Sequence, residues 1–229
     1  MPSDPIPETS TFARDGAERF HCVLSDDDLS EIKSAVSLLP MDRAGIRLTG
    51  IATLNSHFSV DGKIGKLARS ILGAAARPVR AVLFDKTPST NWRLKWHQDR
   101  TIAVQRRVET EGYGPWSIKS GLQHVAPPFA LLARMVTIRV HLDDVDNTNA
   151  PLLVAPGSHR LGRVAESDIS IAVDRCGTCA CLAEAGDAWL YATPILHASD
   201  EASRPSHRRV LQIDYSADRL PEPLEWLGV

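Results

Sequence analysis

Five short strand-like runs dominate the chain after residue 78, and no helical pattern alternates with them. The segments between them carry turn residues, as in the stretch DDVDNTNAP. A doubly wound parallel sheet needs a helix between successive strands, so this pattern argues against that fold and favours an antiparallel sandwich or barrel. The runs are residues 79–85, 135–142, 152–155, 187–192 and 209–215.

Two amphipathic helical patterns precede these runs. Ser25 is a candidate N-cap for a helix over residues 26–39, whose first turn holds three aspartates and whose expected end is Pro40. A second pattern covers residues 61–75 and is expected to stop at Pro78. We therefore expect a mainly β fold with the N-terminal helices packed on one side.

The composition is that of an ordinary globular protein. The 229 residues are 43% hydrophobic and 24% charged, enough for one core without disulfides. The net charge of −2 provides no basic field for nucleic acid or an anionic membrane. We find no membrane-span pattern and no secretory signal, so we expect a cytoplasmic protein. Residues 1–12 are expected to form a flexible arm, and residues 13–229 a single domain.

Two His-x-Asp pairs are the main candidates for chemistry: His97 with Asp99, and His141 with Asp143. Residues i and i+2 of a strand face the same side, so either pair could offer an imidazole and a carboxylate to one point. With a distant histidine such as His197, a pair gives the 2-His-1-carboxylate set of non-haem Fe(II) oxygenases. The alternative for either pair is a hydrogen-bonded surface histidine. Asp143 opens an acidic turn, where a turn-forming role is expected.

A cysteine cluster offers a different kind of site. Cys176, Cys179 and Cys181 form a C-x-x-C-x-C motif. A structural zinc site would need a fourth ligand, for which Cys22 is the candidate, and a redox motif would need a following helix. The favoured interpretation is structural or incidental cysteines, with Cys179 and Cys181 on one face of a strand.

Residues 106–130 form a long segment rich in proline and glycine, which we expect to be an irregular, mobile lid. Trp116, His124 and Arg106 are the candidate substrate contacts within it, although His124 also fits a solvated surface. Arg106 belongs to a basic cluster that either attracts an anionic substrate or forms a solvated loop face. The other members of the cluster are Arg100, Arg107 and Lys119.

The sequence resembles the phytanoyl-CoA dioxygenase family of Fe(II)- and 2-oxoglutarate-dependent oxygenases from about Asp15 to Trp226. The resemblance implies a double-stranded β-helix, a jelly-roll or cupin-like core that holds iron. The motifs that carry it are LFDKTP (83–88), WHQD (96–99), VHLDD (140–144), PGSH (156–159), Gly186 with Asp187, HAS (197–199), Arg208 and LPEPLEW (220–226).

The same resemblance implies that His97, Asp99 and His197 are the iron ligands. It implies that Arg208 binds the distal carboxylate of 2-oxoglutarate, with Ser199 beside it. Strand parity requires Arg208 and Arg209 to face opposite sides, so only one of them can enter the barrel. A guanidinium meets a carboxylate through two parallel hydrogen bonds, which explains why an arginine occupies this position. Lys86 and Thr137 match the family less firmly, and no role is assigned to either.

The implied function is oxidation of a small organic molecule or secondary metabolite with Fe(II), 2-oxoglutarate and O2. Hydroxylation with release of succinate and CO2 is the default, and desaturation, epoxidation or rearrangement are the alternatives. Halogenation is disfavoured because Asp99 is present. The rival functions are a jelly-roll binding protein without catalysis and a zinc module built on the cysteines.

Overall fold

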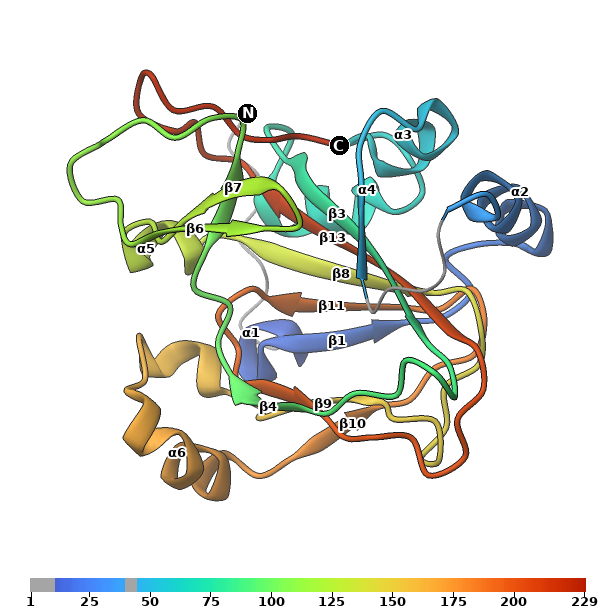
Figure 1. Cartoon of the computed structure of the whole chain (residues 1–229). Helices are drawn as coiled ribbons and strands as arrows, with labels where there is room; N and C mark the ends of the chain where they lie inside the picture. Colours follow the sequence, from blue (N-terminus) through green and yellow to red (C-terminus); the bar gives the residue numbers. More distant parts are fainter. Residues whose placement is uncertain (1–10, 40–44) are drawn as a thin grey trace.

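The computed structural model describes residues 11–39 and 45–229, which form three antiparallel sheets, two of them facing each other (Figure 1). In the larger sheet the strand order is β1 (Ala17–Phe20), β11 (Ala188–Ala192), β8 (Val136–His141), β13 (Arg208–Ser216), β3 (Arg77–Lys86) and β2 (Gly45–Leu48). In the smaller sheet it is β10 (Cys179–Cys181), β9 (Leu152–Val154), β12 (His197–Ser199) and β4 (Leu94–His97). The expected mainly β, antiparallel architecture is confirmed.

Alternate residues of the large sheet face two different environments. On β8, Val136, Ile138 and Val140 belong to the main hydrophobic core. The residues between them, such as Arg139, are also buried but face the smaller sheet. Buried polar side chains reduce stability unless they find partners, so this inner face is the place to look for a site. The pattern repeats on β13, where Leu211, Ile213 and Tyr215 join the core and Arg208, Gln212 and Asp214 face inward.

Three helices cover the outer face of the large sheet: α2 (Asp26–Val36), α3 (Ala52–Phe58) and α4 (Gly65–Leu72) (Figure 1). Ser25 caps α2 in a capping box with Asp28, as the sequence predicts. Helix α4 ends at Gly73, where φ is 78°, rather than at Pro78, which lies within β3. Helix α3 was not predicted.

Two predictions for the N-terminal region fall largely outside the described residues. The expected end of α2 at Pro40 and most of the expected arm (residues 1–12) lie outside the described residues. Thr11 and Phe12 belong to α1 (Thr11–Asp15), and Phe12 is buried in the core. Helix α6 (Ile169–Cys176) borders the smaller sheet, and none of the helices in the described ranges is long and apolar enough to cross a membrane.

The expectation of an irregular segment at residues 106–130 is wrong. The segment contains the hairpin strands β6 (Trp116–Lys119) and β7 (Leu122–Val125), and β5 (Ile102–Val104) pairs with β7 to complete a third sheet. Helix α5 (Phe129–Leu132) follows. This sheet has its own core, which includes Leu220 and Leu224 from the C-terminal segment. The hairpin is therefore stabilised by residues distant in sequence, which a local pattern does not reveal.

Candidate metal centre and cosubstrate pocket

His97 and His197 are direct cross-strand partners on β4 and β12, and their ring centroids lie 4.2 Å apart. Each Nδ1 lies close to the carbonyl oxygen two residues earlier, at 2.8 Å from Lys95 and 2.9 Å from Ile195. A carbonyl oxygen only accepts hydrogen bonds, so each Nδ1 carries the ring proton and each Nε2 keeps its lone pair. This hydrogen bonding is typical of metal-binding histidines.

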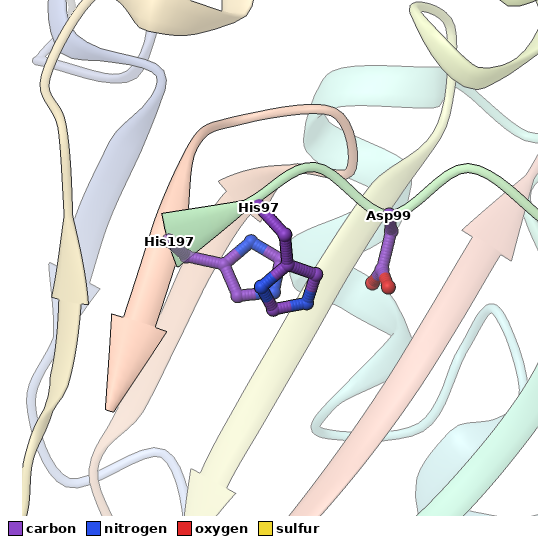
Figure 2. Close-up of side chains that lie close together, drawn as sticks. All are labelled: His97, Asp99 and His197. Carbon is purple, nitrogen blue, oxygen red and sulfur yellow. The ribbon is translucent and has the colours of Figure 1, made fainter. Parts of the chain in front are cut away.

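Asp99 completes a three-residue cluster with these histidines. One potential ligand atom from each of His97, Asp99 and His197 lies within 4.8 Å of the other two. Figure 2 shows both imidazole rings and the carboxylate on the same side of the β4 segment. Two imidazole nitrogens and one carboxylate oxygen are the donor set of the non-haem Fe(II) oxygenases, so these residues fit such a metal.

The electrostatics keep His197 and Asp99 in the forms that bind metals. Burial lowers the pKa of His197 to about 4, so its imidazole is neutral near pH 7. Burial acts to raise the pKa of Asp99, but Arg80 and the two histidines outweigh it and hold that pKa below its ordinary value. Arg80 Nη2 lies 3.6 Å from Asp99 Oδ2, and Arg80 Nε lies 2.6 Å from Asp214 Oδ2.

The competing pair, His141 and Asp143, is not arranged as a metal site. Asp143 accepts hydrogen bonds from the Arg209 guanidinium at 2.8 and 2.7 Å and from the Arg209 backbone N–H at 2.9 Å. Asp143 was expected to form a turn, but its carboxylate binds Arg209 instead. His141 is buried between the sheets, and its two ring nitrogens have no hydrogen-bond partner among the described residues.

Arg208 faces the interior, close to Ser199 and Lys86. Its Nη1 donates to the carbonyl oxygen of Ala150, and its buried Nε has no partner among the residues that the structure describes. Ser199 Oγ also donates to the Ala150 carbonyl, at 3.3 Å, and accepts from Lys86 Nζ at 3.0 Å. Burial, with Arg139 nearby, lowers the pKa of Arg208 to about 9, still well above neutrality.

The sequence predicts no role for Lys86, yet its side chain is fully buried beside Ser199 and Arg208. Burial, with Arg208 and Arg139 nearby, lowers the pKa of Lys86 to about 7. Thr137, the other unassigned residue, bonds instead to Asp214 and Thr193, both at 3.1 Å.

These groups line one cavity of about 230 Å³ between the two sheets. A second, more open depression of about 710 Å³ shares His97, Asp99 and Lys119 with it and leads to the surface. The inner cavity is lined by Arg47, Arg80, Val82, Phe84, Lys86, Trp92, Leu94, His97, Asp99, Lys119, Arg139, Leu152, His197, Ser199, Arg208 and Gln212.

Three lining residues were not predicted from the sequence as members of the site: Arg47, Arg80 and Arg139. Arg80 and Arg139 alternate with core residues along β3 and β8, so the parity argument used for Arg208 would have found them. Arg47 gives a weaker signal, because β2 has only four residues.

The three expected substrate contacts do not line the cavity. Trp116 packs against the core of the third sheet, and Arg106 is exposed. His124 is fully buried on β7 rather than solvated, and burial lowers its pKa to about 4. Lys119, from the basic cluster of the same segment, is the residue that reaches the cavity.

The cysteines belong to other parts of the fold. Cys176 ends α6, while Cys179 and Cys181 lie on β10, as the strand interpretation predicts. Burial raises the pKa of the Cys181 thiol, which disfavours the thiolate that zinc binds. In the described part of the chain, the clusters suited to a metal contain no cysteine.

The comparisons with known proteins agree with this geometry. Residues 12–210 match the family described as phytanoyl-CoA dioxygenase. No curated protein matches the sequence significantly.

Solved structures share the fold at low sequence identity. EctD from S. alaskensis, in its apo form, is 21% identical with a TM-score of 0.69, covering 96% of this chain and 79% of that one. HygX from Streptomyces hygroscopicus, with nickel, 2-oxoglutarate and hygromycin B bound, is 14% identical with a TM-score of 0.61, covering 90% and 84%. SnoN, a non-haem α-ketoglutarate-dependent epimerase from nogalamycin biosynthesis, is 16% identical with a TM-score of 0.64, covering 93% and 86%. The double-stranded β-helix expectation is thereby confirmed. With the family match spanning most of its length, the chain belongs to the phytanoyl-CoA dioxygenase family of Fe(II)- and 2-oxoglutarate-dependent oxygenases.

Proposed function

We propose that His97, Asp99 and His197 hold Fe(II), and that the protein hydroxylates a small organic molecule. The observation that carries this proposal is the pairing of two histidines whose Nδ1 protons are bound by backbone carbonyls, beside an ionised carboxylate. A structural role alone would not require two imidazoles and a carboxylate to offer ligand atoms within 4.8 Å of one another. When bound, Fe(II) supplies with 2-oxoglutarate and O2 the oxidising chemistry that no side chain provides.

Arg208 is the proposed anchor of the distal carboxylate of 2-oxoglutarate. It is buried on the cavity wall, and its unpaired Nε leaves hydrogen-bonding capacity for an anion. Ser199 and Lys86 lie next to it: the Lys86 ammonium offers a further donor to the same carboxylate, and the Ser199 hydroxyl would turn to it from the Ala150 carbonyl. A guanidinium fork in a partly dry cavity gives both orientation and affinity.

The remaining walls position the reactants and exclude water. Hydrogen bonds to Lys95 and Ile195 fix the two imidazole planes, and Arg80 forms an ion pair with the Asp99 carboxylate. An apolar part of the lining limits water near the proposed metal. Its members are Val82, Phe84, Trp92, Leu94 and Leu152.

Hydroxylation is the default among the reactions that this family geometry supports. The epimerase SnoN has a similar fold, so epimerisation joins desaturation, epoxidation and rearrangement as an alternative. Halogenation is disfavoured because the Asp99 carboxylate occupies the position at which a halide would need space. We further propose that residues 13–229 act as one domain and that the protein is cytoplasmic.

The test is succinate formation by the Fe(II)-loaded protein over a panel of small molecules, measured above the substrate-free background. The variant His197→Ala should lose iron and succinate formation, whereas His21→Ala, at an exposed histidine outside the cavity, should keep both. Iron and 2-oxoglutarate bound without any succinate would instead support the non-catalytic binding protein. Full iron content in His197→Ala would refute the proposed centre.

A further inference from the structure

The interior cavity carries more positive charge than the proposed cosubstrate can balance. Six cationic side chains and one carboxylate, Asp99, line it, and within residues 11–39 and 45–229 only Arg80 of the six forms an ion pair. Under the proposed function, the distal carboxylate of 2-oxoglutarate would offset one positive charge at Arg208 and Lys86. The other carboxylate of 2-oxoglutarate and Asp99 would together offset the two positive charges of bound Fe(II). The cations left without a counter-charge are Arg47, Lys119 and Arg139.

Arg47 and Lys119 lie at the end of the cavity away from Arg208. Arg47 on β2 is the cross-strand partner of Val82, whereas Arg208 is the partner of Lys86. Four residues along β3 correspond to about 13 Å. Lys119 interacts electrostatically with Asp99, Arg80 and Arg47 rather than with Arg208. The cavity therefore has two cationic ends, and the proposed cosubstrate uses one of them.

These two side chains are incompletely paired. The Nε of Arg47 is buried without a hydrogen-bond partner in the described part of the chain, and Lys119 Nζ bonds to the Thr101 hydroxyl at 3.0 Å. Burial lowers the pKa of both groups, which measures the cost of their desolvation. The buried Nε of Arg139 also has no partner among the described residues, but Arg139 donates to Gln212 at 2.9 Å and lies over the Phe84 ring. Arg47 is half-buried and Lys119 is exposed at the mouth of the cavity, so an anion bound between them would mainly offset the desolvation of Arg47.

The outer depression supplies a contrast. Its Arg93 pairs with Asp200 at 3.1 Å, and its Arg100 lies 3.6 Å from Glu166. Two of the four lysine and arginine side chains that line this depression are therefore paired with a carboxylate. Because Lys119 lines both spaces, a molecule that enters through the depression meets unbalanced positive charge where the inner cavity begins.

We propose that the substrate is a small organic acid whose carboxylate binds at Arg47 and Lys119. This inference rests on the proposed function, since it assigns Arg208 to 2-oxoglutarate. The inner cavity of about 230 Å³ admits the carboxylate end and the reacting carbon, and the rest of the molecule extends into the outer depression. A phosphate ester would present similar oxyanion chemistry, so the experiment separates the two.

The test uses protein loaded with 2-oxoglutarate and with Ni(II) in place of Fe(II), so that no turnover occurs. Acetate, its neutral match acetamide, and inorganic phosphate are titrated separately by calorimetry. Acetate should bind and acetamide should not. Arg47→Gln and Lys119→Gln should each weaken acetate binding about tenfold or more. Arg47→Lys keeps the charge and should retain part of the affinity, and Arg106→Gln, an exposed arginine away from the cavity, should change nothing.

The outcomes separate this inference from the proposed function. Two results would overturn the proposed acid substrate without affecting the proposed function, provided that metal and 2-oxoglutarate load normally. One is equal binding of acetate and acetamide, and the other is acetate binding that is unchanged in both glutamine variants. If phosphate binds and acetate does not, the proposed substrate is a phosphate ester and not a carboxylic acid. Failure of the wild-type protein to load metal and 2-oxoglutarate overturns the proposed function, and this inference with it.

Discussion

Arg208 and Arg209 are adjacent on β13 but face opposite sides of the large sheet. Arg208 lines the inner cavity, whereas Arg209 forms a bidentate ion pair with Asp143, with its Nη2 2.7 Å from the carboxylate. The two residues have the same charge and nearly the same position in the sequence, so they separate a local contact from a long-range electrostatic effect.

We therefore predict that Arg208→Ala weakens 2-oxoglutarate binding far more than Arg209→Ala. Removing one partner of a desolvated charge pair costs about 2–5 kcal/mol, or roughly 30-fold to several-thousand-fold in affinity. Arg208→Lys should recover part of the loss because it keeps the charge without the fork. Arg209→Ala should mainly lower the free energy of unfolding, by about 1 kcal/mol or less. The measurement is the 2-oxoglutarate dissociation constant, with metal loading determined for each variant. Equal losses at both positions would contradict the assignment.

The two His-x-Asp pairs predict a second contrast. His97→Ala should abolish stoichiometric Fe(II) binding, because the donor set falls to one imidazole and one carboxylate. His141→Ala should keep its iron, although a cavity left in the interior will lower the melting temperature. Metal analysis after anaerobic loading checks both variants, and circular dichroism shows that each is folded. Iron retained in His97→Ala and lost from folded His141→Ala would reverse the choice of pair.

The pKa of Lys86 predicts a pH dependence of cosubstrate binding. Burial lowers this pKa to about 7 in the free protein, and a carboxylate bound beside the ammonium would raise it. Binding then takes up a proton above pH 7, so 2-oxoglutarate affinity should fall as the pH rises from about 7 to 9. Lys86→Met should bind more weakly at pH 7 and lose most of this slope. The same slope in both proteins would assign the titration to another group.

The same shift has a consequence for stability. The folded-state pKa of Lys86 lies below its unfolded value of 10.5, so the unfolded chain binds more protons between these limits. The contribution of Lys86 to the free energy of unfolding should therefore increase as the pH rises from about 7 toward 10. Urea unfolding of wild type and Lys86→Met over this range isolates that contribution. A wild-type contribution that decreases with pH would contradict the shift.

The third sheet predicts a pattern of hydrogen exchange. The amides of β7, paired on both sides by β5 and β6, should be protected even without ligands. Rapid exchange should be confined to residues 106–112, which lie outside the strands. If the segment closes over the site as a lid, this part alone should slow when 2-oxoglutarate and substrate bind. Exchange in β7 as fast as in residues 106–112 would contradict a structured wall.

The sequence predicted the two-sheet architecture because strand periodicity is local, but it could not bring the metal ligands together. His97 and His197 are one hundred positions apart and meet only because β4 pairs with β12. Their proposed role came from resemblance to a family. Residue spacing alone does not distinguish His141 and Asp143 from His97 and Asp99 as metal ligands. The ion pair that makes Asp143 unsuitable as a ligand involves Arg209 on β13, much later in the chain.

Other errors also have physical causes. The strands β6 and β7 are four residues each and lie among turn residues, and their stability depends on Leu220 and Leu224 at the far end of the sequence. The direction of each side chain in this segment depends on strand pairing, which the local sequence does not reveal. Strand pairing directs His124 into the protein and leaves Lys119 as the side chain that lines the cavity.

The alternation along β3, β8 and β13 has a consequence for how such a protein can be altered. Odd and even positions of one strand belong to different environments, so a change such as Gln212→Ala should leave the packing around Leu211 and Ile213 largely intact. Substrate preference could thus be redesigned by randomising the inward positions of three strands while the helix-facing positions stay constant. The fold separates the residues that maintain it from those open to selection for new chemistry, although both sets share the same stretches of backbone.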